Sequence, residues 1–216
     1  SKSVTKIFKK NKLKIKIILV EKPNKHFLIK NINNKYFNSE GNIENMGFAL
    51  MIAKKLKIKK TLIIKALNKF RGLSHRQETI FSRNNLLCVN DSKATSFDAS
   101  LQSLSNYQQI YWIVGGLPKL QDRFHLKLVK KRIIKAYIIG KNISFFKKQI
   151  RKNIPFSISK NMKTAINNIF RDMKLNKSSK KTILLSPAAA SFDQFKNFED
   201  RGNYFKKAIK EKLRKY

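Results

Sequence analysis

Three short polar segments of the sequence carry side chains that could bind an anion. Each follows an apolar run: residues 90–96 (NDSKATS) follow LLCV, residues 115–122 (GGLPKLQD) follow IYWIV, and residues 186–202 (SPAAASFDQFKNFEDRG) follow TILL. In open parallel sheets, ligands bind beyond the carboxyl ends of the strands, so we expect these segments to meet at one edge of a sheet. Cations, hydroxyls and the free N–H groups of helix N-termini suit an anion there. The segments pool Asp91, Lys93, Thr95, Lys119, Ser191 and a helix start near Asp193.

Each segment also has a purely structural interpretation. Two glycines after a strand commonly form only a tight turn. Asp91 can be a turn residue, Lys119 is one lysine among many, and Ser191 and Asp193 can cap a helix. The coincidence of three such segments favours the ligand-binding interpretation.

From Gly72 onward, the elements that must position these segments alternate between strand and helix patterns. Apolar runs predict strands, and periods near 3.6 residues predict helices, one of them capped by Ser96. Such an alternation predicts an α/β fold with a mostly parallel sheet covered on both faces. The predicted strands are 77–82, 86–91, 110–116, 135–140 and 181–187, and the predicted helices are 96–106, 144–150, 160–173 and 202–216.

The first 72 residues follow a different pattern. We expect strands at 12–21, 26–31 and 35–38, then helices at 42–56 and 61–70, with Gly72 ending the second helix. These elements are too few to enclose a core comfortably. Residues 1–72 are therefore predicted to be the remainder of a larger α/β domain, and residues 73–216 to be a complete one.

The chain is strongly basic. Its 216 residues include 49 Lys and Arg against 12 Asp and Glu, a formal net charge of +37. Such a charge attracts nucleic acid or anionic membranes. The basic residues are mostly lysines spread along the chain, together with abundant Ile and Asn, as an AT-rich genome encodes, whereas nucleic-acid surfaces cluster their charge and favour arginine. We therefore expect no nucleic-acid partner.

Cysteine usage and hydropathy indicate a cytoplasmic protein. The single cysteine, Cys88, cannot form an internal disulfide, which favours a reducing compartment. We expect it to be buried in a strand, with a catalytic thiol as the alternative. No stretch approaches the roughly 20 apolar residues of a membrane span. No secretory signal pattern opens the chain, so we expect no membrane insertion.

Four motifs carry a family resemblance: GLSHRQE (72–78), VNDSKATS (89–96), GGLPKLQD (115–122) and LSPAAASFDQFKNFEDRG (185–202). In this order and spacing the chain resembles the D-glutamate-adding Mur ligases of peptidoglycan synthesis, most strongly from Gly72 onward. The resemblance implies that residues 1–72 are the C-terminal part of a P-loop-type α/β ATPase domain. Residues 73–216 would then be the Rossmann-like C-terminal domain. No G-x-x-x-x-G-K-[ST] motif is present, so the phosphate loop and main Mg²⁺ ligands are expected upstream of Ser1.

The resemblance also implies an activity and a set of site residues. The family uses ATP and Mg²⁺ to join UDP-N-acetylmuramoyl-L-alanine to D-glutamate through an acyl phosphate, and we expect a monomer. No metal ligand is assigned to this chain. The implied roles are ATP binding for Asn42, Asn45, Arg76 and Asp91, a catalytic role at the reacting phosphates for Lys93, and D-glutamate binding for Thr95, Lys119, Ser191 and the backbone of Phe198.

Several alternatives stay open. Gly41 stands where the family usually has a histidine, and Asn42 and Asn45 also suit the first turn of a helix. Phe192 and Phe195 are more readily core residues than walls of a substrate site. A basic nucleic-acid-binding module and a remnant domain without catalysis are the alternative functions.

Overall fold

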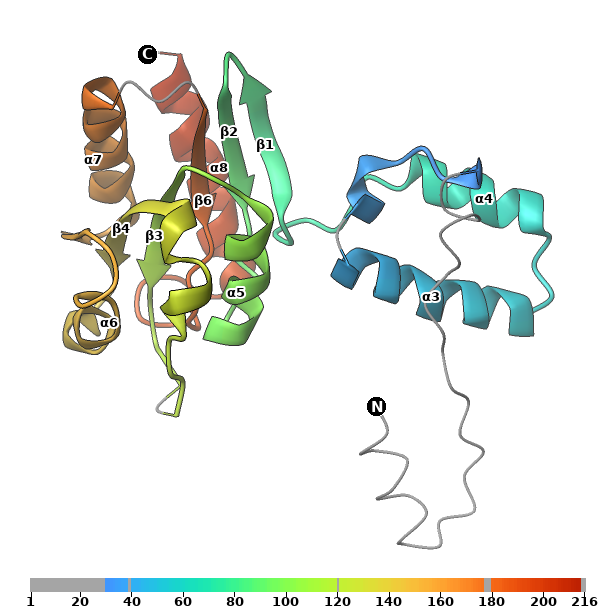
Figure 1. Cartoon of the computed structure of the whole chain (residues 1–216), viewed down its shortest axis with the longest axis horizontal. Helices are drawn as coiled ribbons and strands as arrows, with labels where there is room; N and C mark the ends of the chain where they lie inside the picture. The colour runs from blue at the N-terminus through green and yellow to red at the C-terminus, as the bar shows by residue number, and fades with distance from the viewer. Residues whose placement is uncertain (1–29, 39, 120, 177–179, 215–216) are drawn as a thin grey trace, which may run out of the picture. The chain divides into compact units, whose positions relative to one another are not determined.

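The structure is a computed structural model that describes residues 30–38, 40–119, 121–176 and 180–214. The strand predicted at 12–21 lies outside the described residues, as does most of the one at 26–31. The chain divides into two compact units, Ser1–Arg71 and Gly72–Tyr216 (Figure 1). No helix in the described part is both long enough and apolar enough to cross a membrane.

The described part of the first unit is helical. It contains the 3-10 helix η1 (Lys35–Asn38) and the α-helices α3 (Glu40–Lys55) and α4 (Lys60–Lys69). Both α-helices were predicted, but the strand expected at 35–38 is wrong. Aromatic packing explains the difference: the ring of Phe37 stacks on that of Phe70, 6.1 Å away, and Tyr36 meets both rings edge-on. The segment therefore packs against the end of α4, and Gly72 lies beyond the helix end at Lys69.

The two helices of the first unit leave large apolar side chains in solvent. Helix α4 has no buried residue, and α3 buries Met46. The exposed side chains on these helices and their connection are Phe48, Ile52, Leu56, Ile58 and Leu62.

The second unit is built on a six-stranded sheet with the order β1-β2-β6-β3-β4-β5. Strand β1 runs antiparallel to β2, and all other neighbouring pairs are parallel, which confirms the predicted mostly parallel sheet. The strands are β1 (Glu78–Arg83), β2 (Leu86–Asn90), β3 (Ile110–Gly115), β4 (Ile133–Ile139), β5 (Phe156–Lys160) and β6 (Lys181–Leu185).

Helices cover both faces of this sheet (Figure 1). Successive strand residues point to opposite faces, so the fully buried β3 contributes Trp112 to one core and Tyr111 to the other. The first core includes side chains of α5 (Phe97–Asn106) and α6 (Ile143–Ile150), and the second those of α7 (Met162–Leu175) and α8 (Phe198–Leu213). Cys88 lies buried in β2, as predicted, and burial raises its pKa to about 12.

Two elements differ from the sequence prediction. Strand β5 was not predicted, and it lies half exposed at the edge of the sheet. Helix α8 begins at Phe198 and not at Gly202, because the side chain of Asn197 accepts a hydrogen bond from the N–H of Asp200 at 2.7 Å. The expected helix start near Ser191 and Asp193 is therefore wrong, since those residues lie in turns.

Candidate functional site

The polar segments after β2, β3 and β6 meet at the carboxyl edge of the sheet. They meet because these three strands are parallel neighbours in the order β2-β6-β3. Backbone and side-chain hydrogen bonds join the segments in pairs, as the sequence led us to expect. The bonds run from Asp91 N to Leu185 O (2.7 Å), Ser186 Oγ to Asp91 Oδ2 (3.1 Å), Gly115 N to Pro187 O (2.9 Å), Leu117 N to Ala190 O (2.8 Å), Ala190 N to Leu117 O (3.0 Å) and Phe97 N to Asp122 Oδ2 (3.0 Å).

Asp91 lies at the centre of this junction, with 6% of its surface exposed. Its Oδ1 accepts the N–H of Gln77 at 3.2 Å, and its Oδ2 accepts the hydroxyls of Ser103 and Ser186. A carboxylate offers about four acceptor positions, so Oδ1 can accept one further donor. Burial raises the pKa of Asp91 to about 6 and outweighs the three donors and the charge of Arg76, which lower it.

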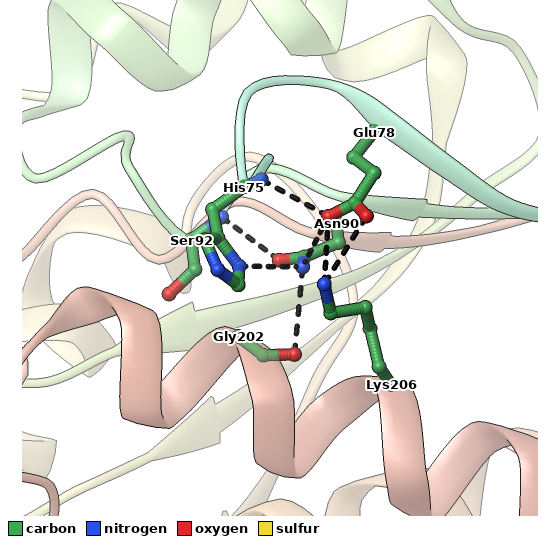
Figure 2. A network of polar contacts seen from close by, with 6 residues as sticks. All are labelled: His75, Glu78, Asn90, Ser92, Gly202 and Lys206. Atoms are coloured by element: carbon green, nitrogen blue, oxygen red, sulfur yellow. Dashed lines mark hydrogen bonds and ion pairs between the residues drawn. The ribbon is translucent and has the colours of Figure 1, made fainter. Parts of the chain in front are cut away.

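A polar network fixes the segment that leads into the sheet (Figure 2). The amide of Asn90 donates to His75 Nδ1 at 2.9 Å and to Glu78 at 3.2 Å, and Glu78 pairs with Lys206 of α8 at 3.1 Å. Burial and, next, the charge of Lys206 lower the pKa of His75, which favours the neutral imidazole. The amide nitrogen of Asn90 can only donate, so Nδ1 of His75 is the acceptor.

This network places Arg76 beside the β2 turn. Its neighbours on both sides are bonded to that turn, since the N–H of Lys93 donates to His75 O at 3.0 Å and that of Gln77 donates to Asp91. The side chain of Arg76 itself is exposed. A planar guanidinium held in solvent next to a buried carboxylate suits the recognition of phosphate oxygens.

Lys93 and Phe198 are in contact. The Lys93 ammonium lies 3.8 Å from the centre of the Phe198 ring, within the range of a cation–π interaction. Ser92 Oγ donates to the carbonyl of Phe198 at 2.8 Å, which ties the β2 turn to the first residue of α8. The first N–H groups of a helix have no partner within it, so the start of α8 can offer a backbone donor here.

The other predicted glutamate-binding residues lie in the same three segments. Thr95 is half-buried in the β2 turn, and Lys119 is exposed in the β3 turn. Ser191 is 2% exposed, and its carbonyl accepts the N–H groups of Gln194 and Phe195. Of the two aromatics considered as core, Phe195 packs against the second core, whereas Phe192 is exposed.

Asn42 and Asn45 belong to the other unit of the chain, where both lie in α3. Asn42 donates to the carbonyl of Tyr36 at 2.7 Å, and Asn45 is exposed. Asn42 thus holds the start of its helix, in agreement with the structural alternative for this residue.

Arg201 is a residue of the site that the sequence interpretation missed. Only 1% exposed, it donates through Nε and NH2 to the hydroxyl and carbonyl of Ser92, and through NH1 to the carbonyl of Ala189. Burial lowers its pKa to about 10. Arg201 therefore connects the β2 and β6 turns from the first turns of α8. In the sequence, Arg201 is one arginine in a lysine-rich helix, and the helix pattern does not predict its burial.

Metal ligands are not gathered in this part of the protein. Among the described residues, no three His, Cys, Asp or Glu side chains lie close enough to hold an ion.

Comparison with solved structures defines the class of fold. The chain superposes on MurF from Acinetobacter baumannii with a TM-score of 0.53, at 14% identity, over 78% of this chain and 38% of that one. It superposes on MurC from Thermotoga maritima with a TM-score of 0.51, at 13% identity, over 82% of this chain and 38% of that one. These similarities establish a Mur ligase-like α/β fold. No protein-family model matches the chain.

Sequence comparison identifies the family. The UDP-N-acetylmuramoylalanine–D-glutamate ligase of Mesorhizobium japonicum is 44% identical over 142 residues, 66% of this chain and 30% of the relative. That of Rickettsia prowazekii is 36% identical over 177 residues, 82% of this chain and 40% of the relative. The chain belongs to the Mur ligase family, and within it to the relatives of these D-glutamate ligases. It spans well under half the length of the relatives it matches.

Proposed function

We propose that this chain is the C-terminal portion of an ATP-dependent ligase that adds D-glutamate to UDP-N-acetylmuramoyl-L-alanine for peptidoglycan synthesis. The observation that supports this most directly is the junction of three motif-bearing segments at one sheet edge. Each segment carries residues that match the ligase motifs, and hydrogen bonds hold them together. The same edge carries exposed or half-buried cations and a helix N-terminus, as a dicarboxylate beside a nucleotide requires.

The residues around Asp91 fit a nucleotide. Arg76 presents a guanidinium to solvent beside the β2 turn, and Asp91 keeps an acceptor position on Oδ1 for a hydroxyl. We assign Arg76 and Asp91 to ATP. For Asn42 and Asn45 of the first unit, ATP binding stays a proposal that rests on the family resemblance alone. ATP, when bound, supplies the phosphoryl group that activates the carboxylate of the muramoyl substrate as an acyl phosphate. We propose that Mg²⁺ serves the same phosphoryl transfer and takes its main ligands from elsewhere in the enzyme, since no three His, Cys, Asp or Glu side chains gather among the described residues.

Lys93 and Phe198 link the nucleotide side of the junction to the amino-acid side. We assign the Lys93 ammonium to the negative charge of the reacting phosphates, where it acts by electrostatic stabilisation. The face of the Phe198 ring holds this ammonium in place without neutralising its charge. The phenyl ring also lowers the water content around the charge, which strengthens its interaction with an anion.

D-glutamate carries two carboxylates, and the β3 and β6 segments offer donors for them. We assign Lys119 to one carboxylate, and the hydroxyls of Thr95 and Ser191 with the backbone at Phe198 to the remaining oxygens. Bonds between Leu117 and Ala190 hold the Lys119 and Ser191 segments side by side. A fixed amino acid presents its amine to the activated carboxylate in one orientation, which lowers the entropic part of the barrier.

We further propose that the first unit is the C-terminal part of the ATPase domain. The exposed apolar side chains of α3 and α4, among them Phe48 and Ile52, would then be covered by the rest of that domain. An uncovered apolar surface of this kind is typical of an interface. The length of the relatives, of which this chain spans 30–40%, is consistent with such a missing part.

The experiment that tests the function is an assay of the full-length enzyme carrying Lys119→Ala. We expect the KM for D-glutamate to rise at least about tenfold and the KM for ATP to change less than about twofold, since one carboxylate loses its cation. Lys148→Ala, which removes an exposed lysine from α6, is the matched control. An equal rise in both KM values would contradict the assignment of Lys119.

A further inference from the structure

The segment between β6 and α8, residues 186–197, crosses the carboxyl edge of the sheet in strand order. Ala190 first pairs with Leu117 in the turn after β3 through two backbone hydrogen bonds. Asp193 Oδ2 then accepts the N–H of Lys141 after β4 at 2.9 Å. Gln194 Nε2 finally donates to the carbonyl of Lys160, at the end of β5, at 2.9 Å. The segment therefore lies as a strap over β3, β4 and β5.

Close approach of the backbone makes this path possible. Gly116 has φ +137° and Gly140 has φ +88°, in the region that favours glycine. A Cβ at Gly140 would overlap the carboxylate of Asp193, and one at Gly116 would overlap the carbonyl of Ala190. The two turns below the strap are thus shaped for contact with it.

Ser191 lies between the anchors of the strap. The paired Ala190 precedes it, and Asp193 and Gln194 follow it by two and three positions. Residues 191–197 form turns and not a helix, so no ladder of helical hydrogen bonds fixes their backbone. The side chains of Asp193 and Gln194 bond the far side of this turn to the ends of β4 and β5, in addition to the packing of Phe195 against the second core.

We propose that Asp193 and Gln194 are positioning residues of the amino-acid site, which hold Ser191 in place relative to the Lys119 turn. This inference rests on the proposed function, because the bound group is the D-glutamate carboxylate. A strap that is already ordered spares the ligand the entropy of ordering it. The loss of an anchor then weakens D-glutamate binding and leaves ATP binding unchanged.

The test measures KM values of the full-length enzyme with Asp193→Ala, Asp193→Asn and the control Asp98→Ala. Asp98 is an exposed carboxylate on α5, so its loss changes the net charge equally. We expect Asp193→Ala to raise the KM for D-glutamate about tenfold, with the KM for ATP and kcat changed less than about threefold, because one charge-assisted bond is lost. Asparagine keeps an acceptor oxygen for the N–H of Lys141 and should restore most of the affinity.

Amide hydrogen exchange in the present chain provides a second readout that needs no activity. The N–H of Lys141 should exchange at least about tenfold faster in Asp193→Ala than in the wild type, and at an unchanged rate in Asp98→Ala. Unchanged exchange, or equal rises in the KM for both substrates, would overturn the inference. If the wild-type enzyme fails to add D-glutamate, the proposed function fails, and the exchange rates alone then decide whether the strap is anchored as described.

Discussion

Replacing Asp91 with asparagine tests the electrostatics at the centre of the site. Burial raises the pKa of Asp91 from 3.8 to about 6. The folded state therefore binds a proton more tightly than the unfolded state. The stabilisation from this proton is fully present below pH 3.8, and it is lost as the pH rises through about 6.

The magnitude follows from the two pKa values. Each pH unit between them corresponds to 1.36 kcal/mol, so the rise from 3.8 to about 6 corresponds to about 3 kcal/mol. The asparagine side chain has the same shape and no charge at any pH. The stability of Asp91→Asn relative to the wild type should therefore increase by about 3 kcal/mol from acid to pH 7.

Urea unfolding between pH 3 and pH 8 measures this difference. Trp112 is the only tryptophan of the chain and is fully buried in the second unit, so its fluorescence reports the unfolding of that unit. Asp98→Asn, on the surface of α5, is the control and should parallel the wild type. Parallel curves for Asp91→Asn and the wild type would refute the reasoning, as would a relative loss of stability with rising pH.

Two further predictions concern the helix that closes the site. Arg201→Met should lower the free energy of unfolding by about 3 kcal/mol in the same urea assay, because three acceptors lose their donor inside the protein. A loss below about 0.5 kcal/mol would contradict the bonding role of Arg201. Gly202→Ala should destabilise the unit by about 2 kcal/mol despite the better helix propensity of alanine, because a Cβ there would overlap His75 Nδ1. An increase in stability would show that His75 moves aside freely, and Asn203→Ala, one exposed position further along α8, is the control.

Sequence patterns predicted most of the second unit because local and tertiary preferences agree there. Strand β3 is a continuous apolar run, and it is buried along its whole length. Helix α5 begins after Ser96, whose side chain accepts the N–H of Ala99 as the capping rule requires. The meeting of three polar segments also followed from the sequence, since adjacent parallel strands bring their carboxyl ends to one edge.

The sequence predictions were wrong or incomplete where tertiary contacts, and not local sequence, determine the structure. Residues 35–38 have the aromatic content of a strand, yet ring contacts with Phe70 select a 3-10 turn. Strand β5 alternates weakly, and its edge position leaves Ile158 exposed. From its sequence, Arg201 could not be distinguished from a surface cation. Its burial depends on acceptors at Ser92, which is far away in the sequence, and at Ala189, which lies across the β6 turn.

The site edge combines features that each carry a cost in free energy. Asp91 is a carboxylate in a buried position, and Arg201 is a buried cation whose bonds go to a hydroxyl and two carbonyls. Ala188, between them in the β6 turn, has φ +55°, a conformation that costs a non-glycine residue on the order of 1 kcal/mol. Taking either charge out of water is costly, and the hydrogen bonds that each group makes offset that cost. Because these costly features gather at one edge and join the segments that carry the ligase motifs, we infer that this edge keeps them for the binding of charged substrates.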